Sequence, residues 1–311
     1  MEIPKDLGSL KTAFEFGIAF LEKHFPESPR IDAEFLLLSL ASMSRTDLIL
    51  NPSKKLSPEI QDKFLNYLER RSRGEPVAYI LGYKDFYKFR FTVSPAVLIP
   101  RPETEELVDY VLNQWIKIRE IKIQKKVPTK KPLIVDLGSG SGCIGLSLLK
   151  SIPESTLICL DVSDEALQIT QKNALNLGLV ENKDFYLFHQ PAEDLHQFKN
   201  KLQVILGRNE IDILVSNPPY IDFNDPLVEL NVKGFEPHEA LFAPEQGFKY
   251  LLDWSKIYSP LLSNPGFLMM EMGHLQSTLV LSHVKSLNLF ENVSVIKDLS
   301  KIDRFIYAEK I

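Results

Sequence analysis

The chain has 311 residues, enough for two domains or for one large domain. Its hydrophobic content of 44% and charged content of 25% are those of a soluble globular protein, and its apolar runs fall short of the roughly 18 residues that span a bilayer. The net charge of −5 argues against a broad DNA-binding surface, which is normally basic. We therefore expect neither membrane insertion nor stable nucleic-acid binding.

Cysteine and histidine usage predicts a protein without a metal. Cys143 and Cys159 are not spaced as a metal or redox motif, and the six histidines show no ligand spacing. Both cysteines lie in apolar segments, which favours buried free thiols and a reducing cytoplasm. The N-terminus lacks the basic region and apolar core of a signal peptide. The default expectation is a cytoplasmic monomer.

Residues 1–75 are predicted to be helical. Apolar residues recur at helical spacing in several segments, and Pro26, Pro29, Pro52 and Pro58 separate those segments. The simplest arrangement is an N-terminal bundle of about four helices.

Residues 76–98 change in character and predict a β-hairpin connector. The runs 77–83 and 86–93 are rich in aromatic and β-branched residues, with turn residues between them. Arg101-Pro102-Glu103-Thr104 then opens a helix that is expected to end near Lys117. Seven basic residues between 117 and 131 indicate a solvated linker.

Strands and helices alternate through the rest of the segment 99–311, which we take as one domain. This alternation predicts an α/β fold, a Rossmann-like seven-stranded doubly wound sheet. The last two strands have a short connection and should form an antiparallel hairpin at the sheet edge. The predicted strands are 133–137, 156–161, 185–189, 211–216, 266–271, 293–297 and 304–309.

A glycine-rich loop follows the first of these strands and opens a helix. It reads Asp136-Leu137-Gly138-Ser139-Gly140-Ser141-Gly142. Glycines let the chain turn tightly and let a ligand approach the backbone. The loop is expected at the point where the strand order reverses, which is where such sheets bind ligands.

The loop allows two cofactors. The segment 140–145 matches G-x-G-x-x-G, and Asp161 lies about 20 residues further on, as in a dinucleotide site. S-adenosylmethionine is favoured because Asp136 ends the strand where it can meet a methionine amino group, whereas a carboxylate would repel a pyrophosphate. Asp161 would accept hydrogen bonds from ribose hydroxyls with either cofactor.

The most informative segment is Asn217-Pro218-Pro219-Tyr220, directly after an apolar strand. Each proline restrains the residue before it to extended backbone, so the chain leaves the strand stiffly. The Asn217 side-chain oxygen and the Pro218 carbonyl can then accept both N–H bonds of one planar amide or arylamine, while Tyr220 packs on it. Such a cradle prepares a poor nitrogen nucleophile for attack. An ordinary turn is the competing interpretation.

With these residues the chain resembles the peptide chain release factor glutamine methyltransferases, the PrmC or HemK family, over nearly its whole length. The resemblance extends to the N-terminal segment 30–37, the connector segment 70–82 and the segment Val97-Leu98-Ile99-Pro100-Arg101-Pro102-Glu103-Thr104-Glu105. It continues in the segments 236–241, 271–276 and 298–304. Asn-Pro-Pro-Tyr alone is also found in adenine methyltransferases, so the connector and the Ile-Pro-Arg-Pro-Glu-Thr-Glu stretch are more specific.

The resemblance implies methyl transfer from S-adenosylmethionine to the glutamine side-chain nitrogen in the Gly-Gly-Gln loop of class I release factors. The N-terminal helices would grip this protein substrate. Substrate contacts would come from Arg101, Glu103 and the segment 217–220, and the adenine contact from Glu193 or Asp194. Glu103 has an ordinary alternative as a first-turn helix carboxylate.

Three other functions stay open at this point. An adenine N6-methyltransferase acting on RNA or DNA would use the same cradle but would want a basic cleft. A noncatalytic adaptor could retain a vestigial cofactor pocket. An NAD-dependent oxidoreductase rests only on the glycine pattern, and Asn217-Pro218-Pro219-Tyr220 has no role in hydride transfer.

Overall fold

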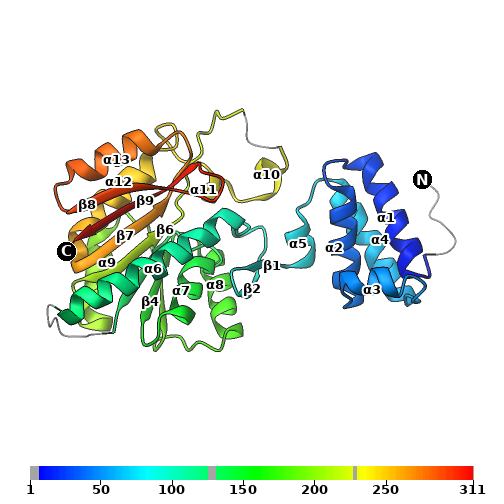
Figure 1. The fold of residues 1–311 in the computed structure, drawn as a ribbon, viewed down its shortest axis with the longest axis horizontal. Coiled ribbons are helices and arrows are strands. Elements are labelled where there is room, and N and C mark those ends of the chain that lie inside the picture. Colours follow the sequence, from blue (N-terminus) through cyan, green and yellow to red (C-terminus); the bar gives the residue numbers. More distant parts are fainter. Residues whose placement is uncertain (1–6, 125–130, 227–229, 311) are drawn as a thin grey trace. The chain divides into compact units, whose positions relative to one another are not determined.

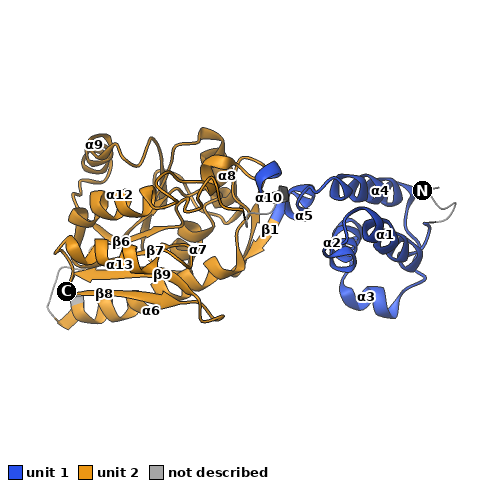
Figure 2. Cartoon of the chain, turned by 90° about the horizontal axis from the view of Figure 1, so that it is seen from above, with its two compact units in different colours: residues 1–83, 230–235 blue, residues 84–229, 236–311 orange. Residues whose placement is uncertain are grey.

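The computed structural model forms two compact units (Figure 2). Unit 1 comprises Met1–Tyr83 and Leu230–Phe235, and unit 2 comprises Lys84–Glu229 and Glu236–Ile311. The residues that the structure describes are 7–124, 131–226 and 230–310. The expectation about a signal peptide, and part of that about the basic linker, fall on residues 1–6 and 125–130, outside the described residues.

Unit 1 is helical. Its helices are α1 (Leu10–His24), α2 (Pro29–Ala41), α3 (Arg45–Leu50), α4 (Pro58–Ser72), α5 (Val77–Leu81) and α10 (Leu230–Phe235). Serine side chains at positions 9, 44 and 57 accept hydrogen bonds from the backbone N–H groups three residues on, at the starts of α1, α3 and α4. These caps satisfy donors that a helix leaves unpaired at its N-terminus, which explains where the helices begin.

The core of unit 1 lies between α1, α2 and α4. Phe64 is fully buried there, and a Cβ atom added at Gly17 would lie 2.7 Å from its ring, so α1 and α4 approach closely. Arg71 Nε donates to Asp32 Oδ2 at 2.7 Å, and the guanidinium lies 3.8 Å from the centre of the Phe25 ring. This buried ion pair ties α4 to α2.

The connector differs from the sequence expectation. The two-stranded sheet consists of β1 (Tyr83–Phe86) and β2 (Phe89–Thr92), and the strand predicted over 77–83 is wrong because residues 77–81 form α5. Pro76 precedes this short helix, and Gly82 ends it with φ of +77°. Proline before and glycine after a single turn outweighed the strand preference of the residues between them.

Unit 2 is built on a seven-stranded sheet of order β5-β4-β3-β6-β7-β9-β8 (Figure 1). The strands β3 to β7 pair in parallel, whereas β9 is antiparallel to both β7 and β8. The predicted Rossmann-like fold and its antiparallel edge hairpin are thus confirmed. The strands are β3 (Leu133–Leu137), β4 (Thr156–Asp161), β5 (Phe185–His189), β6 (Ile211–Ser216), β7 (Leu262–Glu271), β8 (Asn292–Lys297) and β9 (Asp303–Lys310).

Two hydrophobic cores lie on the two faces of this sheet. Helices α6 (Pro102–Gln124), α7 (Cys143–Ser151) and α8 (Asp164–Asn176) contribute to one core. Helices α9 (Leu195–Leu206), α12 (Lys249–Tyr258) and α13 (Ser277–Ser286) contribute to the other. The short helices α11 (His238–Leu241) and η1 (Ser259–Leu261) complete the unit. Along the described ranges, none of the helices combines the length and apolarity needed to cross a bilayer.

Helix α6 runs further than the sequence predicted. It continues past Lys117 to Gln124, so the first half of the basic segment is helical rather than a linker. Ile118 is buried and Ile121 packs against the same core, which extends the apolar face of the helix by one turn.

Candidate active site

The register of the sheet brings the carboxyl ends of three strands together. Leu137 at the end of β3 pairs with Leu160 of β4 on one side and with Ser216 of β6 on the other. The glycine loop, Asp161 and Asn217 therefore meet at one edge, where the strand order reverses. Ser216 also pairs with Met270, so Glu271 at the end of β7 lies beside Asn217.

Backbone hydrogen bonds hold the glycine loop against β4. Gly138 N donates to the Leu160 carbonyl at 2.8 Å, and Gly140 N donates to Asp161 Oδ2 at 2.9 Å. Gly142 has φ of +77°, and an added Cβ atom would lie 2.9 Å from the Thr170 side chain. The loop therefore depends on glycine both for its conformation and for close packing.

Asp136 lies beneath this loop rather than in an open site. Its side chain is buried, and its Oδ2 accepts from Gly145 N at 2.9 Å. Its Oδ1 has no hydrogen-bond partner within residues 7–124, 131–226 and 230–310. Burial raises the pKa of the Asp136 carboxyl to about 7, although the Gly145 N–H opposes the shift. Asp136 thus helps to fix the start of α7.

A cavity of about 480 Å³ opens above the loop in unit 2, a size that suits a cofactor or a drug-sized ligand. The predicted site residues that line it are Arg101, Gly138, Ser139, Gly140, Ser141, Asp161, Glu193, Asn217 and Pro219. Those that do not are Glu103, Asp136, Gly142, Pro218 and Tyr220. Glu103 is exposed to solvent, which leaves its ordinary role as a first-turn carboxylate of α6 intact.

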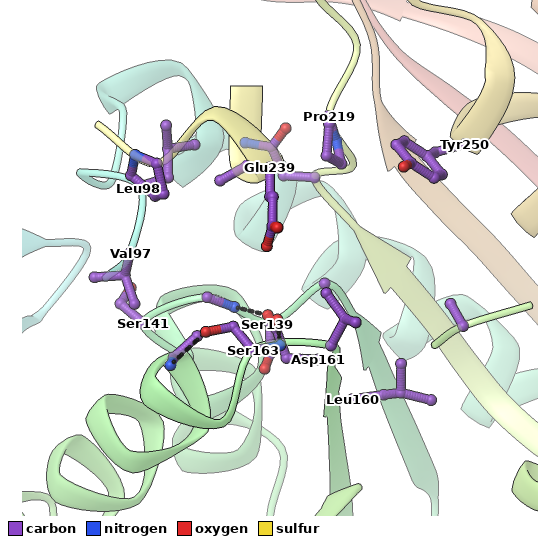
Figure 3. A pocket seen from close by; sticks show the side chains of 18 of the residues that line it. Val97, Leu98, Ser139, Ser141, Leu160, Asp161, Ser163, Pro219, Glu239 and Tyr250 are labelled. Carbon is purple, nitrogen blue, oxygen red and sulfur yellow. Dashed lines mark hydrogen bonds between the residues drawn. The ribbon is translucent and has the colours of Figure 1, made fainter. Parts of the chain in front are cut away.

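Several lining residues were not predicted from the sequence. Figure 3 shows the Glu239 carboxyl reaching from α11 into the cavity toward Asp161, with Val97 and Leu98 on one side and Tyr250 on the other. Burial raises the pKa of the Asp161 carboxyl, and the negative charge of Glu239 adds to that effect. A cavity with two facing carboxyl groups is suited to a ligand that carries hydroxyl groups or positive charge.

Trp254 was also missed, because no local sequence pattern marks it. Its Nε1 donates to Glu193 Oε1 at 3.1 Å, and its ring lies beneath the loop, 3.2 Å from where a Cβ atom on Gly138 would be. The indole therefore connects the loop after β3 to the segment after β5. Glu193 is held at the cavity by this bond.

The polar groups of the cavity fit S-adenosylmethionine. Asp161 uses one lone pair of each oxygen for the N–H groups of Gly140 and Ser163, which leaves lone pairs for hydroxyl donors. The Ser139 hydroxyl is buried at the cavity and has no hydrogen-bond partner among the residues that the structure describes. A buried polar atom without a partner is expected where a ligand completes the site.

The segment after β6 is anchored on both sides of Asn217. Asn217 Nδ2 donates to Thr104 Oγ1 at 3.3 Å, and the Tyr220 hydroxyl donates to Glu271 Oε1 at 3.0 Å. Thr104 lies in the first turn of α6 and lines the cavity. Tyr220 itself does not line the cavity.

Arg101 is held by an ion pair beside the cavity. It donates to Glu236 Oε1 at 2.5 Å, and the other oxygen of that buried carboxylate accepts from Ile99 N at 3.0 Å. The pair joins the segment before α6 to the segment before α11.

Comparisons with known proteins agree with this geometry. Residues 12–82 match the family model "PrmC N-terminal domain", and residues 122–229 match "Methyltransferase small domain". The release factor glutamine methyltransferase of Koribacter versatilis is 34% identical over 97% of this chain and 99% of its own length. The proteins of the same name from Aliivibrio fischeri and Flavobacterium psychrophilum are 33% and 34% identical over 95% and 87% of this chain, and over 95% and 88% of their own lengths. The chain therefore belongs to the release factor glutamine methyltransferase family.

Proposed function

We propose that this chain transfers a methyl group from S-adenosylmethionine to the side-chain nitrogen of the glutamine in the Gly-Gly-Gln loop of class I release factors. The observation that carries the proposal is the Asn217 carboxamide at the wall of the cavity, beside a glycine loop and Asp161. Family membership supports the substrate, since the relatives carry the name of that reaction.

The cofactor would be held by groups on three strand ends. The backbone of residues 138–141 and the Asp161 carboxylate would bind its polar groups, while Glu193 and Trp254 would border its ring system. S-adenosylmethionine supplies an activated methyl group, so the reaction needs no covalent enzyme intermediate. Asp136 would act from below by keeping the loop and the start of α7 in place.

The acceptor nitrogen would be held by two oxygens of the chain. Asn217 Oδ1 and the Pro218 carbonyl would each accept one N–H of the substrate amide and orient its lone pair. Orientation of the reacting atoms supplies much of the rate enhancement in such a transfer. The nitrogen loses a proton readily once it is alkylated, so these residues need not act as a strong base.

The rest of the molecule would serve substrate recognition. The helices of unit 1 would grip the release factor, and Arg101 at the cavity would contact the incoming loop. Release factors act on cytoplasmic ribosomes, so we assign the reaction to the cytoplasm and expect a monomeric enzyme. The exocyclic amine of adenine would fit the same pair of acceptors, but the net charge of −5 favours a protein substrate.

Asn217→Ala tests the proposal. It should lower methyl transfer to a release factor by about 100-fold or more, because an acceptor group in the transition state is lost. S-adenosylmethionine binding, measured by isothermal titration, should largely survive. Asn200→Ala on the exposed part of α9 is the control and should behave as the wild type. An active Asn217→Ala variant would contradict the proposed mechanism.

A further inference from the structure

A chain of hydrogen bonds, centred on a buried bond between Thr104 and Glu271, lies behind the Asn217 side chain. Thr104 Oγ1 donates to Glu271 Oε2 at 2.7 Å and accepts from Asn217 Nδ2 at 3.3 Å. The second oxygen of Glu271 accepts from the Tyr220 hydroxyl at 3.0 Å. Thr104 is 2% exposed and Glu271 is 1% exposed, so water is excluded from the bond between them. Three strand or helix ends, those of α6, β6 and β7, are thereby joined.

The chemistry of the chain fixes which way the Asn217 carboxamide faces. A threonine hydroxyl has one hydrogen, and an ionised carboxylate can only accept. The hydrogen of Thr104 is therefore engaged by Glu271, and Thr104 can only accept from Asn217. Nδ2 must face Thr104, which turns Oδ1 away from it. In the part of the chain that the structure describes, Asn217 Oδ1 accepts no hydrogen bond, and the side chain's one bond is donated by Nδ2.

The geometry around Glu271 is that of a carboxylate that only accepts, because a hydroxyl group donates to each of its two oxygens. Burial raises the pKa of the Glu271 carboxyl above its ordinary value, and the hydroxyl groups of Thr104 and Tyr220 and the positive charge of Arg304 offset only part of that rise. Both hydroxyl groups point at carboxyl oxygens, one at each. Arg304 is itself held by Asp298 at 3.2 Å.

We infer that Thr104 and Glu271 are positioning residues that lock the Asn217 carboxamide with its oxygen presented to the substrate amide. The inference rests on the proposed function for its consequence in catalysis, but the orientation of Asn217 is a property of the free protein. Without the hydrogen bond to Thr104, the carboxamide can rotate by half a turn. Its NH2 group, a donor, would then face the substrate N–H groups in place of the oxygen that accepts from them.

Thr104→Val removes the hydroxyl while it keeps the β-branched shape. We expect kcat to fall by about 10- to 100-fold, the range for a misplaced group at a reacting centre, with the KM for the release factor little changed. Thr104→Ser restores the hydroxyl and should recover most of the activity. Ser263→Ala is the control for loss of a buried hydroxyl, since Ser263 lies at the start of β7, at the opposite end of the strand from Glu271.

A second readout does not depend on activity. In protein labelled with ¹⁵N at asparagine, the Asn217 side-chain signals are identified by their absence in Asn217→Asp. Their hydrogens should exchange slowly with water in the wild type and in Thr104→Ser, and rapidly in Thr104→Val. Glu271→Gln, which keeps the shape of the side chain but removes its charge, should also weaken this protection and lower kcat.

The outcomes separate the inference from the proposed function. A wild-type protein that methylates the release factor, together with a Thr104→Val variant of equal kcat and equal Asn217 protection, would overturn the inference. A wild-type protein that methylates no release factor would contradict the proposed function instead, and the exchange measurement would still decide whether the lock exists. Equal protection of the Asn217 side-chain hydrogens in wild type, Thr104→Val and Glu271→Gln would refute the inference, whether or not the release factor is methylated.

Discussion

Replacing Asp136 with asparagine should remove a large part of the pH dependence of the stability of unit 2. The folded pKa of this carboxyl is about 7, raised by burial, and its unfolded value is about 3.9. Because the folded pKa is above the unfolded pKa, the Asp136 carboxyl contributes most to the free energy of unfolding below about pH 4, where it is protonated in both states. This contribution is lost as the pH rises to 7. Above pH 7 the loss is complete and the curve levels off.

The size of the effect follows from the two pKa values. Each unit of pKa difference corresponds to about 1.4 kcal/mol, so the full loss is about 4 kcal/mol. Between pH 5 and pH 8 the wild type should lose about 2 to 3 kcal/mol through Asp136. Asparagine can still accept from Gly145 N, and its buried amide adds a cost of about 1–3 kcal/mol that does not vary with pH.

Urea denaturation at several pH values between 5 and 8 measures this directly. Both tryptophans of the chain, Trp115 and Trp254, lie in unit 2, so tryptophan fluorescence follows the unfolding of that unit. The free energy of unfolding of the wild type should fall relative to Asp136→Asn as the pH rises. Other titrating groups are shared by both proteins and cancel in the difference. Parallel curves for the two proteins would refute the assignment of the raised pKa to Asp136.

Three further substitutions test separate parts of the structure. Gly142→Ala should raise the cofactor Kd about tenfold or more in isothermal titration, because the loop must shift. Gly178→Ala is the control: Gly178 has a similar φ of +74° but open space around it, so the Kd should stay unchanged. Equal effects of the two substitutions on the Kd would contradict this reasoning. Trp254→Phe leaves Glu193 without its donor and should likewise raise the cofactor Kd; an unaltered Kd would exclude a role for this pair. Arg71→Ala should lower the free energy of unfolding of the helical unit by about 3–5 kcal/mol in circular dichroism, whereas a loss below about 1 kcal/mol would be that of an exposed pair.

The sheet was predictable from sequence because its strands are short apolar runs that end in polar or glycine residues. Strand β6, for example, is buried at every position and ends directly before Asn217-Pro218-Pro219. The first strand of the connector was not predictable from composition, because Val77 and Ile80 favour strands while the flanking Pro76 and Gly82 favour a helical turn. Local signals at the two ends decided the outcome.

Site residues that directly follow a strand were predictable from the sequence. Site residues that only tertiary packing brings to the cavity were not. The glycine loop and Asn217 follow directly from β3 and β6, so their sequence positions place them at the cavity. Trp254 comes from α12 and Glu239 from α11, and only the folded structure brings them to the same cavity. Thr104 stands beside the predicted Glu103, but the helix turns Thr104 inward and Glu103 outward.

The most direct test of the account is transfer of a labelled methyl group from S-adenosylmethionine to a purified class I release factor. The release factor is supplied with its Gly-Gly-Gln glutamine intact or changed to alanine, and tRNA, rRNA and DNA are offered in parallel. The account predicts label on the protein only when the glutamine is intact. Label on a nucleic acid and none on the release factor would contradict it and assign the Asn217 cradle to adenine.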